Sequence, residues 1–484
     1  MTATQESPTS TAEAPLASAS SAASAAPAAG AAPSASADGS HLWRHFATMG
    51  DEKPVRVIES AEGCYLIDSE GNRLLDAIAN LFCVNIGYSY GEEIGLVAAE
   101  QYAKLPYHSA WSSTHPAANA LAAKVAELAP GDLDHVFFTP SGGESVEAAI
   151  KIARQYFHLK GENRFKVITR YNAYHGTSLG ALSMIGIPAY RASFEPMTPG
   201  GLRVRNTRRV GRPENETEEE FTAFLLDDLE QRILQEGPDT IALILMEPVQ
   251  NHGGMLVPPK GYSAGVRALA DRYGILLASD ETITGWGRTG EWFASSRFET
   301  QPDIITTAKG LSSAYAVIGC AIASEKVFAP FREAGVSFTH GNTFGAHPVQ
   351  SAVALKNLEI MERLDLNSHV KAKEEDLRST LAAALEGFGI VRDLRGTGFF
   401  YAIEFANTKA DGTSLTGEQL AKLYGKETLA KFEDEGVIFR LGTGGGIPVL
   451  SVCPPLVADQ PEFDHMAAAL RAVLPVLQAE FDAL

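Results

Sequence analysis

Between about residues 95 and 335, short β-rich runs alternate with amphipathic helical segments. The runs are HVFFT (135–139), FKVITR (165–170), IALILM (241–246), GILLAS (274–279) and DIITT (303–307), and segments such as ESVEAAIKIARQYF (144–157) separate them. Strands that alternate with helices form a mostly parallel sheet covered by helices on its faces. We therefore predict an α/β fold with a parallel sheet at its centre.

The flanking regions have a different pattern. Residues 1–40 are almost all Ala, Ser, Pro, Thr and Gly, a composition that predicts a disordered tail. After about residue 345, long helices (348–364 and 368–388) precede a few strands (399–405, 436–440 and 449–456), which indicates a smaller α+β domain. We assign residues 41–95 and 346–484 to this smaller domain, built from both chain ends, and residues 96–345 to the large domain.

Charge and cysteine usage exclude several classes of function. Forty Lys and Arg against 59 Asp and Glu give a net charge of −19 with no basic run, so we predict no nucleic-acid partner. No apolar run has the length of a membrane helix, and the first basic residue is Arg44, so we predict neither a membrane partner nor a secretory signal. Four well-separated cysteines without metal-ligand spacing suit reduced thiols, a cytoplasmic protein and no metal site.

Unusual residues follow the predicted strands, where ligands bind in parallel α/β sheets. Gly142 and Gly143 in PSGGE follow the first run and begin a helix, which either forms an anion site for a phosphate or is only a tight turn. Tyr174 and His175 follow the second run and offer flat rings to an aromatic ligand, unless they are a core pair.

Carboxylates and a lysine follow the next three runs. Glu247 follows IALILM, Asp280 and Glu281 follow GILLAS, and Lys309 follows DIITT. Buried carboxylates need a positive partner, and a desolvated lysine becomes nucleophilic near neutral pH. Lys309 is therefore either a nucleophile or only the ion-pair partner of Asp280. A phosphate cradle, an aromatic ring, an Asp and a desolvated Lys are together what pyridoxal 5'-phosphate (PLP) requires.

Three long motifs resemble those of the class III aminotransferases of fold type I, in particular the ω-transaminases. DETITGWGRTG (280–290) resembles the family's DEVxTGFGRTG, TTAKGLSSAYAVIG (306–319) resembles AKGxxxGYxPxG, and HGNTFGAHP (340–348) resembles HGxTYSGHP. The likeness extends from about residue 41 to the C-terminus. It implies a fold type I PLP-dependent transferase that acts as a homodimer with shared active sites.

The resemblance implies a role for each matching residue. Lys309 would be the Schiff-base lysine and the proton shuttle, and Asp280 would pair with the pyridinium nitrogen. Tyr174 would stack on the cofactor ring, and Thr343 would reach the phosphate in the neighbouring subunit. The other cofactor-binding residues would be Ser141, Gly142, Gly143, His175, Glu247 and Thr282.

The resemblance also suggests how the substrate is bound. Arg440 matches the mobile arginine that binds the acceptor's carboxylate, unless it is a surface arginine at a strand end. Phe82 stands where the family commonly has Trp, and Trp111 would line the same pocket from the partner chain, although either could be a core aromatic. Departures from the family pattern are found at Gly143, Thr282, Ala314 and Val317.

The leading hypothesis is a PLP-dependent aminotransferase with ping-pong kinetics, which moves an amino group from an amine or ω-amino acid to a keto acid such as pyruvate. The alternatives are another PLP reaction on this fold, such as an aminomutase or decarboxylase, a non-catalytic binding protein, or a dehydrogenase. PSGGES is a poor substitute for the GxGxxG opening of a dehydrogenase. The donor stays open, because the conformation of residues 188–216 does not follow from the sequence. Within it, Arg203, Arg205, Arg208 and Arg209 could meet an acidic substrate or lie in solvent.

Overall fold

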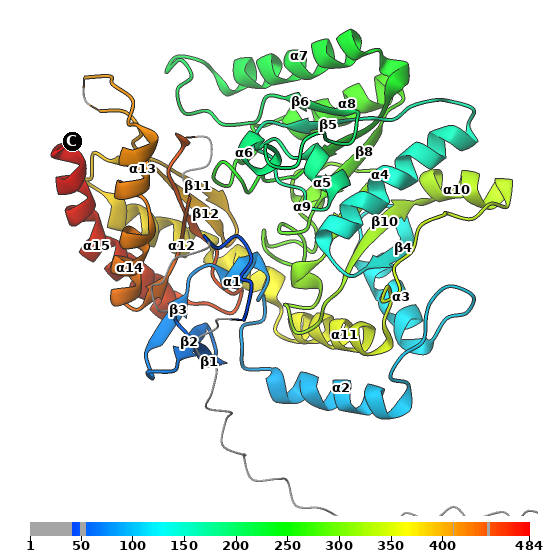
Figure 1. The fold of residues 1–484 in the computed structure, drawn as a ribbon, viewed down its shortest axis with the longest axis horizontal. Coiled ribbons are helices and arrows are strands. Elements are labelled where there is room, and N and C mark those ends of the chain that lie inside the picture. Colours follow the sequence, from blue (N-terminus) through cyan, green and yellow to red (C-terminus); the bar gives the residue numbers. More distant parts are fainter. Residues whose placement is uncertain (1–40, 49–54, 410, 443–445) are drawn as a thin grey trace, which may run out of the picture. The chain divides into compact units, whose positions relative to one another are not determined.

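A computed structural model describes residues 41–48, 55–409, 411–442 and 446–484 (Figure 1). The tail predicted over residues 1–40 lies outside these ranges. The chain divides after Val57 into two units, and the described residues of the first unit, 41–48 and 55–57, contain only turns and extended segments. All the helices and strands below belong to the second unit, Ile58–Leu484.

A seven-stranded sheet forms the centre of the second unit. Its strand order is β4 (Leu133–Thr139), β10 (Gly319–Ser324), β9 (Ile304–Thr307), β8 (Leu276–Asp280), β7 (Ile241–Met246), β5 (Lys166–Arg170) and β6 (Gly201–Val204). The last five strands of this order, β9 to β6, are parallel to one another. β10 is antiparallel to both β4 and β9, so β4 points the same way as the other strands. The predicted parallel α/β sheet is therefore confirmed.

Helices cover both faces of this sheet, as Figure 1 shows. Residues of α4 (Gly142–Leu159) and α10 (Glu325–Ala334) pack with Leu243 and Leu245 of β7 on one face. Residues of α7 (Glu218–Glu236) and α8 (Tyr262–Tyr273) pack with Ile241 and Ile244 on the other face. Burial on both sides explains why all six residues of β7 are apolar.

Two smaller sheets complete the unit. One has the order β1 (Ile58–Glu62), β2 (Tyr65–Asp68), β3 (Arg73–Asp76) and β13 (Val437–Ile438), and the other has the order β11 (Val391–Thr397), β12 (Phe400–Phe405), β15 (Val449–Val452) and β14 (Arg440–Gly442). β13 pairs in parallel with β3, so segments from both chain ends share one sheet. This pairing agrees with a smaller domain built from both ends, while the predicted domain boundaries stay a prediction.

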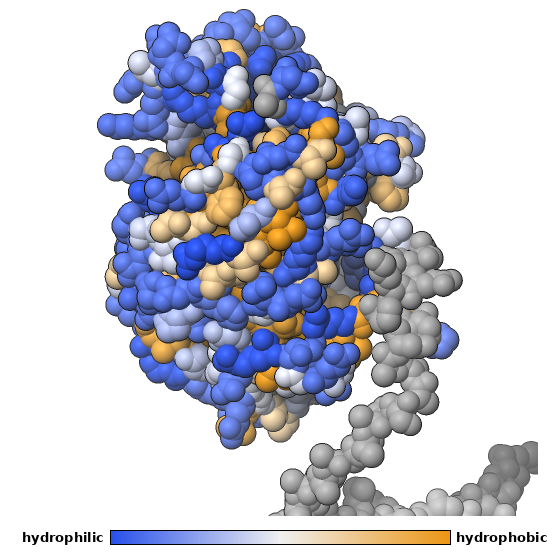
Figure 2. Space-filling view, turned by 90° about the vertical axis from the view of Figure 1, so that its left-hand side faces the viewer, coloured by the Kyte–Doolittle hydropathy of each residue, from blue (hydrophilic) through white to orange (hydrophobic). Residues whose placement is uncertain are grey.

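The helices after the large sheet match the predicted segments. α11 spans Pro348–Arg363 and α12 spans Leu366–Leu385. The sequence did not single out α15 (Gln460–Asp482), which packs against α12. The side of the molecule that carries α13 (Gly417–Leu423) and α14 (Lys426–Asp434) is mostly hydrophilic, with scattered apolar residues (Figure 2). The remaining helices are α1 (Ala79–Phe82), α2 (Gly91–Lys104), α3 (Pro116–Leu128), α5 (Leu179–Met184), α6 (Pro188–Arg191) and α9 (Ala294–Arg297), with 3₁₀ turns at Pro238–Thr240 and Lys309–Leu311.

None of the helices in the described part of the chain is long and apolar enough to cross a membrane. The four cysteines form no disulfide: Cys64, Cys320 and Cys453 are buried, and Cys83 is partly buried. Three of the four thiols are therefore small buried side chains.

Four of the arginines in the 188–216 segment were singled out from the sequence, and each contacts protein groups. Arg203 donates to the carbonyls of Ser183 and Ile185, while Arg205 pairs with Asp228. The others contact Glu216 (Arg209) and Glu404 (Arg208). Arg205 and Arg209 are exposed, which agrees with the expected alternative that these arginines lie in solvent, whereas Arg203 and Arg208 are partly buried against protein groups.

Glu404 is the centre of a buried ion cluster between this segment and β11. Its side chain is 2 % exposed and contacts Arg208, and Arg395 Nη1 lies 2.8 Å from its Oε2. We predict that Glu404→Ala lowers the free energy of unfolding by about 3 kcal/mol, because two guanidinium groups lose their buried counterion. Urea denaturation measures this loss.

A surface glutamate provides the control for Glu404→Ala. Glu375 is 70 % exposed and pairs with Arg378 one helical turn away. Glu375→Ala should cost less than about 1 kcal/mol, because exposed ion pairs contribute little. Equal effects of the two substitutions would contradict the role given to the buried cluster.

Candidate active site

The predicted site residues meet at one edge of the large sheet. β8 ends at Asp280, β7 ends one residue before Glu247, and β9 ends two residues before Lys309. Asp280 is in register with Thr306 of β9, and Ser279 with Met246 of β7. Since the strands are parallel, their carboxyl ends lie side by side, and this geometry brings Asp280, Glu247 and Lys309 to the same edge.

Asp280 is a buried carboxylate held by two neighbours. Its Oδ2 accepts a hydrogen bond from His175 Nδ1 at 2.8 Å, and its Oδ1 accepts from Thr282 Oγ1 at 2.6 Å. Burial opposes ionisation, but the hydrogen bond and charge of His175 and the bonds from Thr282 outweigh it, so the pKa of Asp280 is lowered. His175 therefore orients Asp280, whereas the sequence suggested that its ring could stack on a ligand.

Glu247 is the second carboxyl group at this edge, and its environment is different. It is 6 % exposed, and its Oε2 accepts only from the amide of Asn251, at 2.9 Å, while Oε1 has no partner among the described residues. Burial raises the pKa of Glu247, and the nearby Asp280 charge raises it further. The pKa values of the two carboxyl groups are therefore shifted in opposite directions, lowered at Asp280 and raised at Glu247.

Lys309 presents a buried amine to the same edge. Its Nζ lies 5.6 Å from the centre of the Phe82 ring. Burial lowers the pKa of Lys309, although the charges of Cys83, Asp280 and Glu247 oppose that shift. A desolvated amine with a lowered pKa is a nucleophile near neutral pH.

The backbone around Lys309 is held in an unusual conformation. Lys309 has a φ of +40°, in the left-handed region, and begins a 3₁₀ turn. At Gly310 a Cβ atom would lie 2.4 Å from Asn85 Nδ2, so only glycine fits there. Asn357 Nδ2 donates to the carbonyls of Gly310 and Leu311 at 2.9 and 3.0 Å. These contacts fix the strained position of the amine.

The start of α4 lies where the sequence predicts a phosphate cradle, and that role stays a prediction. Ser141 caps the helix by accepting a hydrogen bond from the Glu144 amide at 3.3 Å, and the first amides of a helix have no partner inside it. A Cβ on Gly142 would lie 2.7 Å from Thr282 Cγ2, so only a glycine backbone fits against Thr282. At Gly143 a Cβ would make ordinary contacts of 3.7 Å or more, so the family's serine would also fit.

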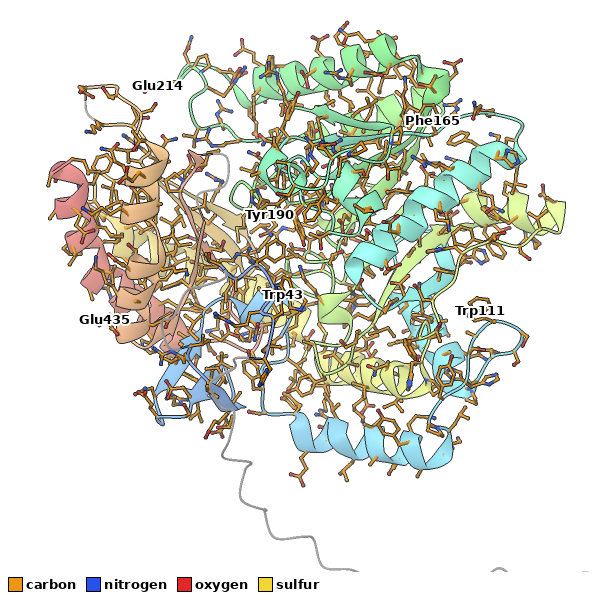
Figure 3. The ribbon with its side chains drawn as sticks, in the orientation of Figure 1. Trp43, Trp111, Phe165, Tyr190, Glu214 and Glu435 are labelled. Atoms are coloured by element: carbon orange, nitrogen blue, oxygen red, sulfur yellow. The ribbon has the colours of Figure 1, made fainter. Side chains whose placement is uncertain are left out.

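A row of aromatic rings extends from Tyr174. The Tyr174 and Tyr190 rings pack edge to face with centroids 6.3 Å apart, and Tyr190 packs edge to face with His252 at 6.0 Å. Tyr190 lies near the middle of the view in Figure 3. We call these three rings the aromatic wall, and Asp280 is among the charges that act on Tyr174.

Phe82 lies close to both Lys309 and Arg440. Phe82 is 3 % exposed and packs edge to face on Phe400 at 6.0 Å. The Arg440 guanidinium lies 5.7 Å from the Phe82 ring centre, as the Lys309 amine lies 5.6 Å from it. Two cationic groups of the site therefore lie near the Phe82 ring, and Arg440 is exposed at the start of β14.

Two predicted residues lie apart from this cluster within the chain. Trp111 is 72 % exposed, lies at the right-hand side of Figure 3 and approaches Gly341. Thr343 is exposed, and its carbonyl accepts a hydrogen bond from Tyr107 at 2.7 Å. Both predicted roles involve a second chain and stay predictions.

The sequence did not identify three residues that contribute to the site. The Cys83 thiol is an electrostatic neighbour of Lys309, and Tyr190 and His252 belong to the aromatic row. The sequence offers one local signal for His252: the Gly-Gly pair that follows it predicts a tight turn shortly after the end of β7. Conversely, Glu281 points away from the site, because its carboxylate accepts from the amides of Ala294 and Ser295 at the start of α9.

The arrangement fits PLP. The cradle at α4 suits a phosphate, the ionised Asp280 suits a protonated ring nitrogen, and the desolvated Lys309 suits the aldehyde carbon. The unpartnered Glu247 Oε1 and His175 Nε2 show that polar groups at this edge are not satisfied by the described protein alone. Fold and site together define a fold type I enzyme of the PLP-dependent transferase class.

The comparison with known proteins agrees with this class. Residues 46–474 match the model of the class-III aminotransferase family, so the chain belongs to the class-III aminotransferases. These are PLP-dependent enzymes, and the chain is accordingly an aminotransferase.

Individual relatives cover most of the chain. A probable aminotransferase of Mycobacterium tuberculosis is 44 % identical over 91 % of this chain and 94 % of its own length. The putrescine–pyruvate aminotransferase of Pseudomonas aeruginosa is 34 % identical over 88 % of this chain and 91 % of its own. The crystal structure of an (S)-enantioselective omega-transaminase from Thermomicrobium roseum has a TM-score of 0.84 and 37 % identity, and covers 90 % of this chain and 96 % of its own.

The lowered pKa of Lys309 predicts a pH-dependent stability. Because its folded pKa lies below the ordinary 10.5, the unfolded state binds more protons between the two values, and the cost of burying the amine falls as pH rises through that window. We predict that Lys309→Met raises the melting temperature of the cofactor-free enzyme at pH 7, and that this gain shrinks toward pH 10.5. Thermal unfolding at a series of pH values measures it.

An exposed lysine provides the control for Lys309→Met. Lys104 lies at the end of α2 and is exposed. Lys104→Met should leave the dependence of the melting temperature on pH as it is in the wild type. A gain for Lys309→Met that is the same at every pH would show that the amine is not desolvated.

Proposed function

We propose that the protein transfers an amino group from an amine or ω-amino acid to a keto acid, with PLP as cofactor and pyruvate as acceptor. The observation that carries the proposal is the buried Lys309 amine at the strand edge beside the ionised Asp280. Membership of the class-III aminotransferases supports the reaction type. We further propose a ping-pong order, in which the donor's product leaves before the keto acid binds.

Each proposed role follows from a property of this chain's residues. When bound, PLP supplies an electron sink for negative charge at the carbon that carries the transferred nitrogen. Asp280 offers its carboxylate to a protonated ring nitrogen, and the α4 amides with Ser141 and Thr282 face the phosphate. Lys309, once its amine is free, moves a proton between neighbouring atoms, since its lowered pKa leaves it able to accept one.

Substrate binding is assigned to Arg440 and the aromatic wall. A guanidinium matches a carboxylate in a bidentate pair, so Arg440 is proposed to bind the carboxylate of pyruvate or of an ω-amino acid. The name of the Pseudomonas aeruginosa relative, a putrescine–pyruvate aminotransferase, supports pyruvate as acceptor. Phe82 and Tyr174 are proposed to border the carbon chain of the substrate.

We also propose a homodimer in the cytoplasm. Trp111 and Thr343 are exposed within one chain, as expected of residues that complete a partner's site. The absence of disulfides among the four cysteines suits a reducing compartment.

The main rival is another PLP reaction on this fold, an amino shift or a decarboxylation. Such an enzyme would turn over without a keto acid, whereas an aminotransferase needs both substrates. A non-catalytic protein would bind the cofactor and leave it unchanged. The visible spectrum of the cofactor-loaded enzyme distinguishes these alternatives.

The two half-reactions can be observed directly. The visible band of the cofactor-loaded enzyme should fall when β-alanine or 1-phenylethylamine is added and return when pyruvate follows. A band that neither addition changes favours the rival chemistries, and the absence of any band rejects the assignment of Lys309.

A substitution series identifies the lysine responsible. Lys309→Ala should remove both the band and turnover, with a loss of at least about 1,000-fold, because nucleophile and proton carrier are lost together. Lys104→Ala, at an exposed position, should retain both. Activity retained in Lys309→Ala would refute the proposal.

A further inference from the structure

Arg170 places a positive charge inside the large sheet domain. It ends β5 and is 1 % exposed. Its Nη2 donates a hydrogen bond to the carbonyl of Glu247, and the Tyr262 hydroxyl is a second polar neighbour. Its Nε is buried and has no hydrogen-bond partner among the described residues, none of which forms an ion pair with it. A buried charge needs a counterion, and these protein groups do not supply one.

A second buried arginine is satisfied in a different way. Arg288 is 0 % exposed, and its Nε likewise has no partner among the described residues. However, its two terminal nitrogens donate to the carbonyls of Phe399 and Pro454 and to Asn85 Oδ1. Three acceptors surround that guanidinium, whereas a single backbone carbonyl accepts from that of Arg170.

Arg170 lines a cavity with a volume of about 40 Å³. Roughly 10–15 Å³ of such volume are enough for one water molecule, so the cavity has room for an ion the size of chloride. Its walls are mostly apolar and include Met246, Val266 and Leu277, with the hydroxyl-bearing Tyr262 and Ser263 among them. A guanidinium and hydroxyl groups in apolar surroundings bind an anion and offer nothing to a cation.

This cavity is separate from the predicted phosphate cradle. Met246, Val266 and Leu277 belong to the core that lies between the large sheet and the helices α7 and α8. The residues of α4, whose start is the predicted cradle, pack on the other face of the sheet. The two places are therefore on opposite faces, and a phosphate in the cradle does not fill the cavity.

The carboxyl groups around the cavity do not pair with Arg170. Glu247 lines it, but its Oε2 accepts from the Asn251 amide at 2.9 Å, and burial raises its pKa, which favours its neutral form. Glu281 approaches the wall at Ser279, 3.3 Å from its hydroxyl, and accepts from the amide of Ser295 at 3.0 Å. An anion beside Arg170 thus meets a cation that is not yet neutralised.

We propose that the cavity behind the end of β7 binds one small monovalent inorganic anion, the size of chloride, as the counterion of Arg170. The anion accepts a hydrogen bond from Nε. Because the same guanidinium donates to the carbonyl of Glu247, the anion stabilises the strand end that carries Glu247 to the site. It is neither substrate nor cofactor, so this inference does not depend on the proposed function.

Thermal unfolding of the cofactor-loaded enzyme tests the proposal. The melting temperature in sodium chloride should exceed that in sodium gluconate of equal ionic strength, because gluconate is too large for the cavity. The difference should saturate with chloride and reach at least about 2 °C. In Arg170→Met, which keeps the length of the side chain and removes its charge, it should fall below about 0.5 °C.

A surface arginine provides the control for Arg170→Met. Arg378 is 55 % exposed, and Arg378→Met should keep the full effect of chloride. A wild type that unfolds at the same temperature in both salts overturns the proposal. So does an Arg170→Met variant that keeps the effect, since chloride would then bind elsewhere.

A second measurement needs no variant to fold. Crystals of the wild type grown in sodium bromide should show an anomalous peak in the cavity, within contact distance of Arg170 Nε. Bromide found only at the protein surface, with water alone in the cavity, overturns the proposal. Because neither experiment requires turnover, failure of the proposed function leaves both results unaffected.

Discussion

The hydrogen bond between His175 and the buried Asp280 is the interaction on which the site depends. A carboxylate at the end of β8 would take up a proton on burial, but His175 and Thr282 stabilise its charged form. Glu247, one strand away, lacks such support and its pKa is raised. One sheet edge thus holds two carboxyl groups whose pKa values are shifted in opposite directions, and Asp280 is the one whose negative charge is stabilised. The position of Lys309 and of the helix cradle follows from the same parallel arrangement of strands.

The lysine is the second constraint, because its amine is costly to bury and its backbone is strained. Both costs are offset by contacts from distant parts of the chain. Asn85 donates to the carbonyl of Trp286 at 2.7 Å, Arg288 donates to Asn85 at 2.9 Å, and Trp286 donates to Thr307 at 2.6 Å. The segment after α1 and the DETITGWGRTG motif are therefore coupled to β9, the strand that precedes Lys309. The DETITGWGRTG motif therefore supplies Asp280 to the site and also stabilises the backbone before Lys309.

The sequence predicted much of this architecture because its signals are local. The five β-rich runs became β4, β5, β7, β8 and β9, and the residues after them meet at one edge, as parallel topology requires. β10 was not predicted, because its antiparallel pairing between β4 and β9 depends on tertiary contacts that no local sequence pattern indicates. His252 and Tyr190 were missed for the same reason: their ring contacts depend on tertiary packing, which brings Tyr190 against both Tyr174 and His252. Trp111 and Thr343 depend on a second chain, which the sequence of one chain cannot position.

The central claim is that Lys309 is the residue to which the cofactor is attached. Reduction of the cofactor-loaded enzyme with borohydride would make that attachment permanent, and mass spectrometry of the digested protein would locate it. We expect the added cofactor mass on the peptide that contains Lys309, and none on that peptide when the enzyme is first converted with an amine donor. The added mass on another lysine, or on no lysine, would contradict the account.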